Sequence, residues 1–241
     1  MELTFLLILF IISFLYSSVG HGGASGYLAL MALFGMEPSL MKSSALVLNL
    51  FVSSIAFFAF YKGGYFKWRL LLPFIITSIP MAYIGARISI NPMIYRYILG
   101  VCLLAGIGRM LLMPRHSSVQ TKPFPFSAGL VTGAILGFVS GLIGIGGGII
   151  LSPILLLFRW ANIKETAAVS SVFIFLNSAS GLFGLSLSGV IISHELLTWV
   201  SVAIAGGIAG SLAGSFKLNH LSLKYILAGV LLVASIKLFV I

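Results

Sequence analysis

Two long apolar runs, residues 3–35 and 126–158, constrain the fold more than any other feature of the chain. Each would form about 50 Å of helix, whereas about 20 residues suffice to cross the hydrocarbon core of a bilayer. Shorter apolar runs lie near residues 44–60, 70–86, 97–113, 167–186, 196–214 and 222–241. Only 7% of the residues are charged, whereas a soluble domain carries about 25%. The pattern predicts an all-α polytopic membrane protein, because a membrane barrel would show alternation in segments of about ten residues.

The charged residues exclude several classes of function. The chain has four acidic residues, too few to favour catalysis by paired carboxylates or an acidic metal site. Its net charge of +10 comes from Lys and Arg residues scattered singly between apolar runs, so we expect no nucleic-acid partner. The single Cys102 rules out a disulfide framework and a cysteine metal site. We therefore expect a protein that is not an enzyme and uses no cofactor.

Glycine clusters interrupt both long runs, Gly20-His21-Gly22-Gly23 in the first and Gly144-Ile145-Gly146-Gly147-Gly148 in the second. Each run is either one tilted helix or a hairpin that turns at its glycines, and positive charges discriminate between the two. With single crossings, Lys and Arg divide about evenly between the sides. With hairpins, one side has Lys62, Lys67, Arg69, Arg109, Arg115, Lys122, Arg159, Lys164, Lys217 and Lys224, and the other has Lys42, Arg87, Arg96 and Lys237. This bias favours hairpins, with both termini outside the cytoplasm.

The two halves of the chain look like copies of one another. Leu33-Phe34 and Leu157-Phe158 follow their glycine clusters at the same distance, and Asn49 corresponds to Asn177 in the next span. We interpret residues 1–113 as a first transmembrane repeat, 114–125 as a cytoplasmic linker and 126–241 as a second repeat. A returning hairpin followed by three crossings would insert the second repeat upside down. Such inverted-topology repeats are typical of secondary transporters.

The glycine clusters are the strongest candidates for a binding site. A turn inside the membrane needs positive φ, and the helix after it begins with free N–H groups and a positive dipole end. Two hairpins entering from opposite faces would direct two such ends at one central cavity, which suits an anion. Alternatively the glycines only allow close packing, as expected for two stripes: Gly133, Gly137 and Gly141, and Gly206, Gly210 and Gly214. As a packing residue, Gly133 is expected to tolerate alanine.

Polar residues inside the apolar runs add to this candidate site. His21 is ionisable, so it either binds an anion or carries a coupled proton, or else it forms a neutral hydrogen bond at the turn. Asn49 and Asn177 are amides within spans. They either bind a polar substrate or tie helices together across the interface between repeats.

The Ser43-Ser44 and Ser170-Ser171 pairs open the next span of each half. They either cap their helices or offer hydroxyls to an oxyanion. Lys42 beside the first pair either attracts anions or extends its ammonium to the headgroups. The candidate substrate-binding residues are therefore Gly20, His21, Gly22, Gly23, Ser43, Ser44, Asn49, Gly144, Gly146, Gly147, Gly148, Ser170, Ser171 and Asn177.

The second glycine cluster, followed by Pro153-Ile154-Leu155, resembles the Gly-rich signature of the TauE/SafE sulfite exporter family. The first cluster, the two serine pairs and Gly63-Gly64 before Trp68 agree with it, and the resemblance covers nearly the whole chain. The resemblance implies export of small sulfur-containing anions, such as sulfite or organosulfonates, across a bacterial inner membrane.

We therefore expect a multi-pass inner-membrane transporter that exports a small anion by alternating access. The alternative is a channel for a small anion or a neutral solute, which would not show counterflow. The expected partners are the anionic substrate and the lipid bilayer, with protons as the candidate coupling ion. The sequence leaves open the identity of the substrate and whether the protein forms an oligomer.

Overall fold

The computed structural model describes residues 2–18, 21–112, 121–187, 194–214, 231–232 and 234–240, and every regular element in these ranges is a helix. The helices are α1 (Glu2–Ser18), α2 (Ala24–Leu33), α3 (Pro38–Lys62), α4 (Trp68–Arg87), α5 (Pro92–Leu112), α6 (Phe126–Ile143), α7 (Gly148–Leu157), α8 (Ile163–Ser186) and α9 (Leu196–Gly214). Residues 234–240 are helical as well. The all-α prediction is confirmed for these ranges. Most of the expected span 222–241 and of the linker 114–125 lies outside them.

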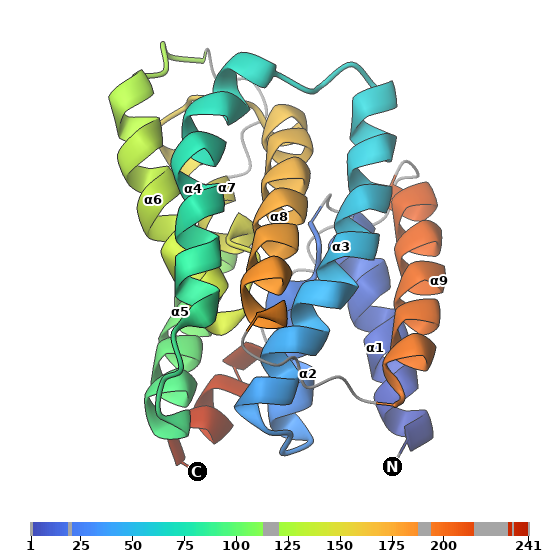
Figure 1. Ribbon diagram of the computed structural model, residues 1–241. Coiled ribbons are helices and arrows are strands. Elements are labelled where there is room, and N and C mark those ends of the chain that lie inside the picture. The colour runs from blue at the N-terminus through green and yellow to red at the C-terminus, as the bar shows by residue number, and fades with distance from the viewer. Residues whose placement is uncertain are drawn as a thin grey trace.

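Each long apolar run is divided at its glycines into a longer helix and a shorter one that runs back (Figure 1). In the first run, the rings of Phe5 in α1 and Phe34 after α2 lie 5.2 Å apart. In the second run, the Lys122 amide before α6 donates to the Arg159 carbonyl after α7 over 2.8 Å. Helices α2 and α7 have 10 residues each, which is about 15 Å and too short to cross a bilayer core. Each run therefore enters the bundle and returns to the end it came from.

Helices α3 and α8 pack side by side in the centre of the bundle, and two helix pairs flank them (Figure 1). Helix α4 packs against α6 on one side, and α1 packs against α9 on the other. Large buried side chains such as Tyr27, Phe74 and Phe173 fill the spaces between these layers. Each hairpin therefore packs against a helix from the other half of the chain. Both glycine breaks face the central helices α3 and α8.

Glycines allow the close approach in both outer pairs. A Cβ on Gly133 of α6 would lie 2.3 Å from the Phe74 carbonyl oxygen of α4. A Cβ on Gly210 of α9 would lie 2.1 Å from the Phe14 carbonyl oxygen of α1. The small-residue stripes are therefore packing surfaces, as their spacing predicts. The expectation that Gly133 tolerates alanine is wrong, because the added methyl group would meet backbone atoms that cannot rotate away.

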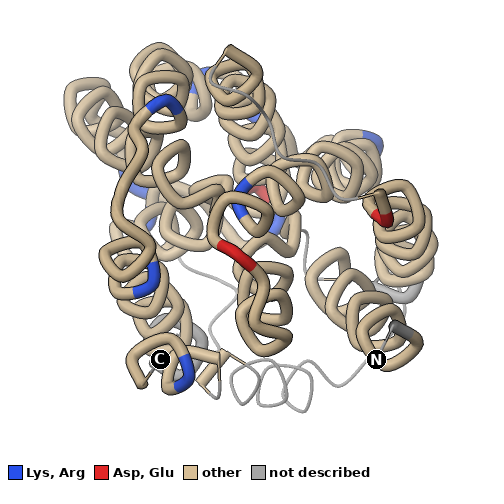
Figure 2. The backbone as a smooth tube through the Cα atoms, turned by 60° about the horizontal axis from the view of Figure 1, so that its bottom comes forward, with Lys and Arg blue, Asp and Glu red and all other residues tan. Residues whose placement is uncertain are grey.

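Four of the described helices, α3, α4, α6 and α8, are long and apolar enough to cross a membrane. The described Lys and Arg residues lie near the two ends of the bundle and appear in Figure 2 as isolated segments of the tube. We call one end charge-rich and the other charge-poor. The charge-rich end carries Lys62, Lys67, Arg69, Lys122, Arg159 and Lys164, and the charge-poor end carries Lys42, Arg87, Arg96 and Lys237.

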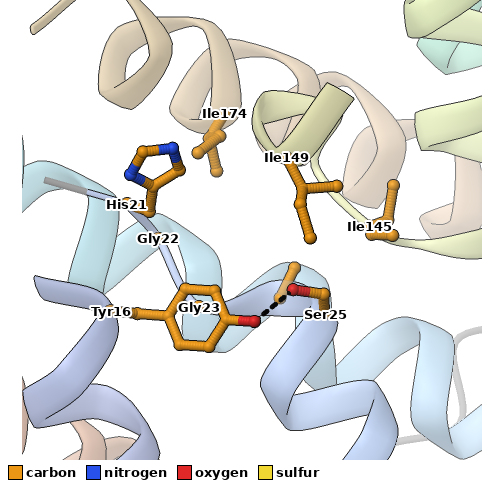
Figure 3. Close-up of a pocket in the computed structure, with 9 residues that line it drawn as sticks. Tyr16, His21, Gly22, Gly23, Ser25, Ile145, Ile149 and Ile174 are labelled. Carbon is orange, nitrogen blue, oxygen red and sulfur yellow. Dashed lines mark hydrogen bonds between the residues drawn. The ribbon is translucent and has the colours of Figure 1, made fainter. Parts of the chain in front are cut away.

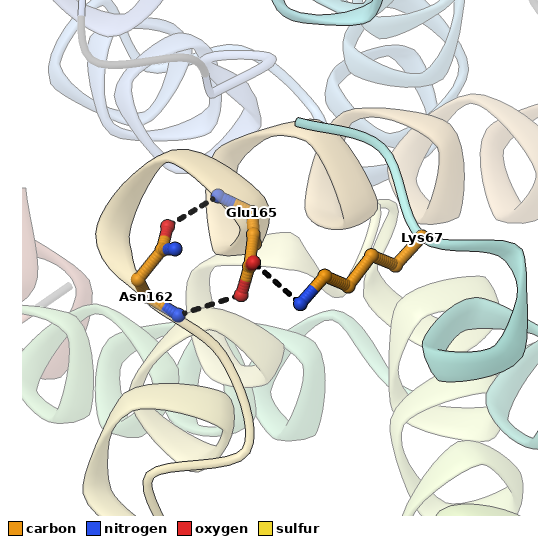
Figure 4. Close-up of polar contacts among 3 residues, drawn as sticks. All are labelled: Lys67, Asn162 and Glu165. Carbon is orange, nitrogen blue, oxygen red and sulfur yellow. Dashed lines mark hydrogen bonds and ion pairs between the residues drawn. The ribbon is translucent and has the colours of Figure 1, made fainter. Parts of the chain in front are cut away.

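Residues at the start of α8 form polar contacts that connect it to the α3–α4 loop at the charge-rich end. Asn162 and Glu165 form a capping box, in which the Glu165 amide donates to Asn162 Oδ1 over 2.9 Å and the Asn162 amide donates to Glu165 Oε2 over 3.1 Å (Figure 4). The other carboxylate oxygen of Glu165 pairs with Lys67 Nζ from the α3–α4 loop at 2.5 Å. The Lys67 side chain is 54% exposed, so the pair adds little stability by itself. It joins the α3–α4 loop to the start of α8.

Candidate functional site

The two glycine breaks meet at the Asn49 side chain of α3. We call residues 21–23 the first break and residues 144–147 the second break. A Cβ on Gly22 would lie 3.2 Å from Asn49 Oδ1, and a Cβ on Gly146 would lie 2.7 Å from Asn49 Nδ2. Asn49 is fully buried near the middle of α3, and its Nδ2 donates to Ser178 Oγ of α8 over 3.4 Å. The amide therefore lies between both breaks and both central helices, and its Oδ1 has no hydrogen-bond partner among the described residues.

The imidazole of the first break belongs to a chain of polar groups that crosses from one hairpin to the other. His21 Nε2 lies 2.8 Å from Ser152 Oγ of α7, which lies 2.9 Å from Ser170 Oγ of α8. The Ser152 hydroxyl has a single proton and donates it to the Gly148 carbonyl over 2.9 Å. When that proton points to Gly148, Ser152 accepts from both neighbours, with a hydrogen on His21 Nε2 and Ser170 as the second donor. In that arrangement His21 presents a donor to the second hairpin in its neutral form as well as when charged.

A small cavity lies between the breaks (Figure 3). Residues of both hairpins and of α8 line it: Tyr16, His21, Gly22, Gly23, Ala24, Ser25, Ile145, Ile149 and Ile174. On its floor the Tyr16 and Ser25 hydroxyls are hydrogen-bonded at 2.6 Å. The cavity volume is about 10 Å³, which is roughly the space of one water molecule. An oxyanion of several atoms fits only after the hairpins or α8 move.

The second break is made of backbone that only glycine adopts easily. Gly144, Gly146 and Gly147 have φ of 81°, 72° and 73°, in the left-handed region. Gly144 ends α6, and its amide donates to the Ser140 carbonyl over 2.8 Å. Gly147 caps the start of α7, and a Cβ on it would lie 2.8 Å from the Phe173 ring. This break is therefore closely packed, and it offers a helix N-terminus toward α8 rather than polar side chains.

Some of the predicted residues do not join this cluster. Ser43 donates to carbonyls of its own helix, those of Ser39 and Leu40, and Ser171 donates to Ala168. Asn177 donates to Phe173 over 2.8 Å, while its Oδ1 has no described partner. Ser44 is fully buried, and its hydroxyl likewise has no described partner. Gly20 lies outside the described residues.

Two structural roles suggested by the sequence are wrong. Helix α3 begins at Pro38 after Glu37, and α8 begins at Ile163 after the Asn162 cap, so the serine pairs lie inside these helices rather than at their caps. Lys42 does not extend to the headgroups. Its side chain is 7% exposed, and Nζ donates to the Ala86 carbonyl of α4 over 2.9 Å.

The structure adds polar residues that the sequence reasoning missed. Ser152, at the centre of the His21 chain, and Ser25, on the cavity floor, both follow a glycine cluster by less than one and a half helical turns. A hydroxyl in the first turns of a broken helix inside an apolar run was the available signal. Within the described residues, no group of three or more His, Cys, Asp or Glu side chains could hold a metal ion.

Comparison with known proteins identifies the family. The family model described as "Sulfite exporter TauE/SafE" matches residues 5–238. The chain belongs to the TauE/SafE family. It is 37% identical over 233 residues to "Probable membrane transporter protein y4hK" of Sinorhizobium fredii, covering 95% of this chain and 94% of that protein.

Two more distant relatives carry similar names. The chain is 29% identical to "Probable membrane transporter protein MJ0441" of Methanocaldococcus jannaschii, over 76% of this chain and 74% of the relative. It is 26% identical to "Probable membrane transporter protein YunE" of Bacillus subtilis, over 73% of this chain and 72% of that protein. No solved structure matches. This TauE/SafE protein is therefore a membrane transporter, and its family match covers both glycine breaks, α1 from its fourth residue onward and all of α2 to α9.

Proposed function

We propose that this TauE/SafE protein is a secondary transporter that exports a small anion, sulfite or an organosulfonate, by alternating access. The observation that carries the proposal is the meeting of two glycine breaks at Asn49, next to the His21–Ser152–Ser170 chain. Backbone N–H groups at the starts of α2 and α7, with His21 and Ser170, would bind the anion. The glycines Gly22, Gly23, Gly146, Gly147 and Gly148 would keep side chains out of its way.

Alternating access is supported by the size of the cavity. A space of about 10 Å³ cannot hold an oxyanion. Substrate entry therefore requires a rearrangement, as a carrier makes in each cycle. The packing of α4 against α6 and of α1 against α9 supports two repeats of opposite orientation, because exchanging the two halves turns one pair into the other. The boundary between them would lie in the 114–125 linker.

The orientation of the protein follows from its charges. We propose that the protein lies in the inner membrane with its charge-rich end facing the cytoplasm. Both termini would then face outside the cytoplasm. Reporter fusions at Ser118 and at Ile241 test this orientation. An active cytoplasmic reporter at Ser118 and an active external reporter at Ile241 are expected. A cytoplasmic C-terminus would overturn both the orientation and the inverted repeats.

Transport itself is tested with the purified protein. Sulfite, sulfate, thiosulfate and a series of sulfonates are screened for stabilisation against heat, because a ligand that binds the folded state raises the melting temperature. The protein is then reconstituted into liposomes and loaded with the stabilising anion. Saturable counterflow of labelled anion is the expected result. Flux that neither saturates nor shows counterflow would indicate a channel instead.

A further inference from the structure

Lys42 is a buried cation that the proposed site does not use. It lies in the second turn of α3, and its side chain is 7% exposed. The second break packs directly on it, because a Cβ on Gly144 would lie 3.0 Å from the Lys42 carbonyl oxygen and 3.2 Å from Lys42 Cγ. A buried ammonium is costly unless an opposite charge or several hydrogen bonds compensate for lost water.

The described partner of this ammonium is a neutral carbonyl. Nζ donates to Ala86 O in the last turn of α4 over 2.9 Å, where helix carbonyls lack partners of their own. An ammonium has three donors. The one ion pair among the described residues joins Lys67 to Glu165. No described carboxylate therefore neutralises Lys42. An anionic ligand would supply the missing charge.

Lys42 also lies on the face of α3 that lines the breaks. Residues 42, 49 and 53 are spaced by seven and four, which places them on one side of a helix. Gly144 packs on Lys42, Gly146 on Asn49, and Gly22 on both Asn49 and Ser53. The Ser53 hydroxyl donates to the Asn49 carbonyl over 2.5 Å. A buried polar stripe therefore leads from the charge-poor end of α3 to the centre of the bundle.

We propose that Lys42 is the counter-ion that the transported anion meets between the breaks and the charge-poor end. In this proposal the ammonium exchanges the Ala86 carbonyl for an oxygen of the anion, so that substrate arrival releases the end of α4. The inference rests on the proposed anion transport and assigns the charge selectivity to one residue. The polar stripe on α3 would line the path of the substrate, and Lys42 would make that path selective for anions.

The experiment compares a charged ligand with a neutral one of the same shape. Methanesulfonate and dimethyl sulfone are titrated against the purified full-length protein, and thermal stabilisation gives their apparent Kd values. Lys42→Gln keeps a donor for Ala86 but removes the charge, and Lys42→Arg keeps the charge. Lys237→Gln is the matched control, because Lys237 Nζ also donates to a helix-end carbonyl, that of Leu33, at the same end of the bundle.

The charge role predicts a loss of selectivity. Lys42→Gln should raise the apparent Kd for methanesulfonate by about 10-fold to 100-fold, which is the usual contribution of a charged hydrogen bond to affinity. The affinity for dimethyl sulfone should not change. Lys42→Arg should retain most of the affinity, and Lys237→Gln should match the wild type. Equal weakening of both ligands, or a lower melting temperature with unchanged affinities, would show that Lys42 only ties α3 to α4. A wild-type protein that binds no anion at all would instead overturn the proposed function and this inference with it.

Discussion

The first glycine break carries an imidazole, and the second carries Ile145 at the corresponding place in its half of the chain. Around the first break, side chains form polar contacts: His21 with Ser152, and Tyr16 with Ser25. Glycines of both breaks are closely packed, since Cβ atoms on Gly22 and Gly23 would meet Asn49 and Tyr27 and those on the second break would meet Asn49, Phe173 and Lys42, but the second break adds no polar side chain of its own. Three of the four residues of the second break have positive φ, against Gly23 alone in the first.

The difference indicates that the two hairpins contribute different chemistry. The first supplies groups that can donate, accept or carry a proton, and the second supplies a backbone shape that brings α7 close to α3 and α8. In the proposed transporter, corresponding positions of the two repeats need not keep the same chemistry, because one central site would need each group only once. Substitutions in the second break should therefore act through packing and backbone strain, and substitution of His21 in the first through hydrogen bonding and charge.

The largest effect is expected at Gly146. Gly146→Ala places a methyl group 2.7 Å from Asn49 Nδ2 and forces a residue with a side chain to adopt φ of 72°. We expect transport to be lost and the protein to be destabilised by about 2–4 kcal/mol, because strain and overpacking add. Counterflow and the melting temperature of the purified variant measure the two effects.

Gly64→Ala is the matched control for the backbone. Gly64 has the same φ of 72°, but a Cβ there would meet nothing within 4 Å. Its substitution should cost only about 1 kcal/mol, the penalty for the left-handed conformation, and should leave transport intact. If both variants behave alike, close packing against Asn49 is not what the second break requires.

The next effect is expected in the helix that leads into the second break. Gly133→Ala should destabilise the protein by about 1–3 kcal/mol, because its Cβ would overlap the Phe74 carbonyl of α4. Gly108→Ala in α5 meets no atom within 4 Å and should be neutral or stabilise by up to about 1 kcal/mol. Melting temperatures of both variants test this. An unchanged value for Gly133→Ala would mean that α4 and α6 can separate freely.

The effect of alanine at Gly133 depends on tertiary packing that the sequence does not contain. The helices, the hairpins and the glycine breaks could be predicted, because they depend on the lengths of apolar runs and on the backbone freedom of glycine. The consequence of a methyl group at Gly133 depends on how closely α4 approaches, which spacing within α6 does not contain. The same limit explains why the serine pairs were expected at helix starts, since Pro38 and Asn162 begin those helices earlier.

Part of the candidate site could be predicted as well. The clusters, His21 and Asn49 stood out because polar groups and glycines are unusual inside apolar runs. Their partners did not, because Ser152 is 131 residues from His21 and Ser178 is 129 residues from Asn49. Which face of α7 or α8 reaches the break is decided by tertiary packing. The burial of Lys42 has the same origin, since Ala86 lies 44 residues away in α4.

In the polar chain of the first break, Ser152→Ala should have an intermediate effect. It removes the hydroxyl that lies between His21 and Ser170, so the partly buried imidazole and the fully buried Ser170 hydroxyl both lose a hydrogen-bond partner. We expect a loss of about 1–3 kcal/mol in stability and weaker substrate binding. Ser171→Ala is the control, because among the described residues the Ser171 hydroxyl donates to the Ala168 carbonyl of its own helix. Equal melting temperatures for the two variants would contradict a joined His21–Ser152–Ser170 chain.

The smallest expected effect, and the one most specific to the first break, concerns His21→Gln. Glutamine can still donate to Ser152, so the variant should fold and transport, but it cannot change charge. Imidazole has a reference pKa of about 6.5, so a titrating His21 would change transport over roughly pH 5 to 8. Because the imidazolium attracts an anion, wild-type affinity should be highest at low pH and fall as pH rises. The variant should show little of this dependence.

The measurement uses methanesulfonate, which stays ionised throughout that range, whereas sulfite titrates near neutrality and would confuse the two effects. Tyr16 is the other titratable residue among those that line the cavity, and a free phenol has a reference pKa near 10, well above that of imidazole. A flattened profile in a stable His21→Gln protein therefore assigns the titration to the imidazole. An unaltered profile would remove the charge of His21 from the mechanism. Anion binding would then rest on backbone N–H groups, hydroxyls and Lys42, and the two breaks would differ only in shape.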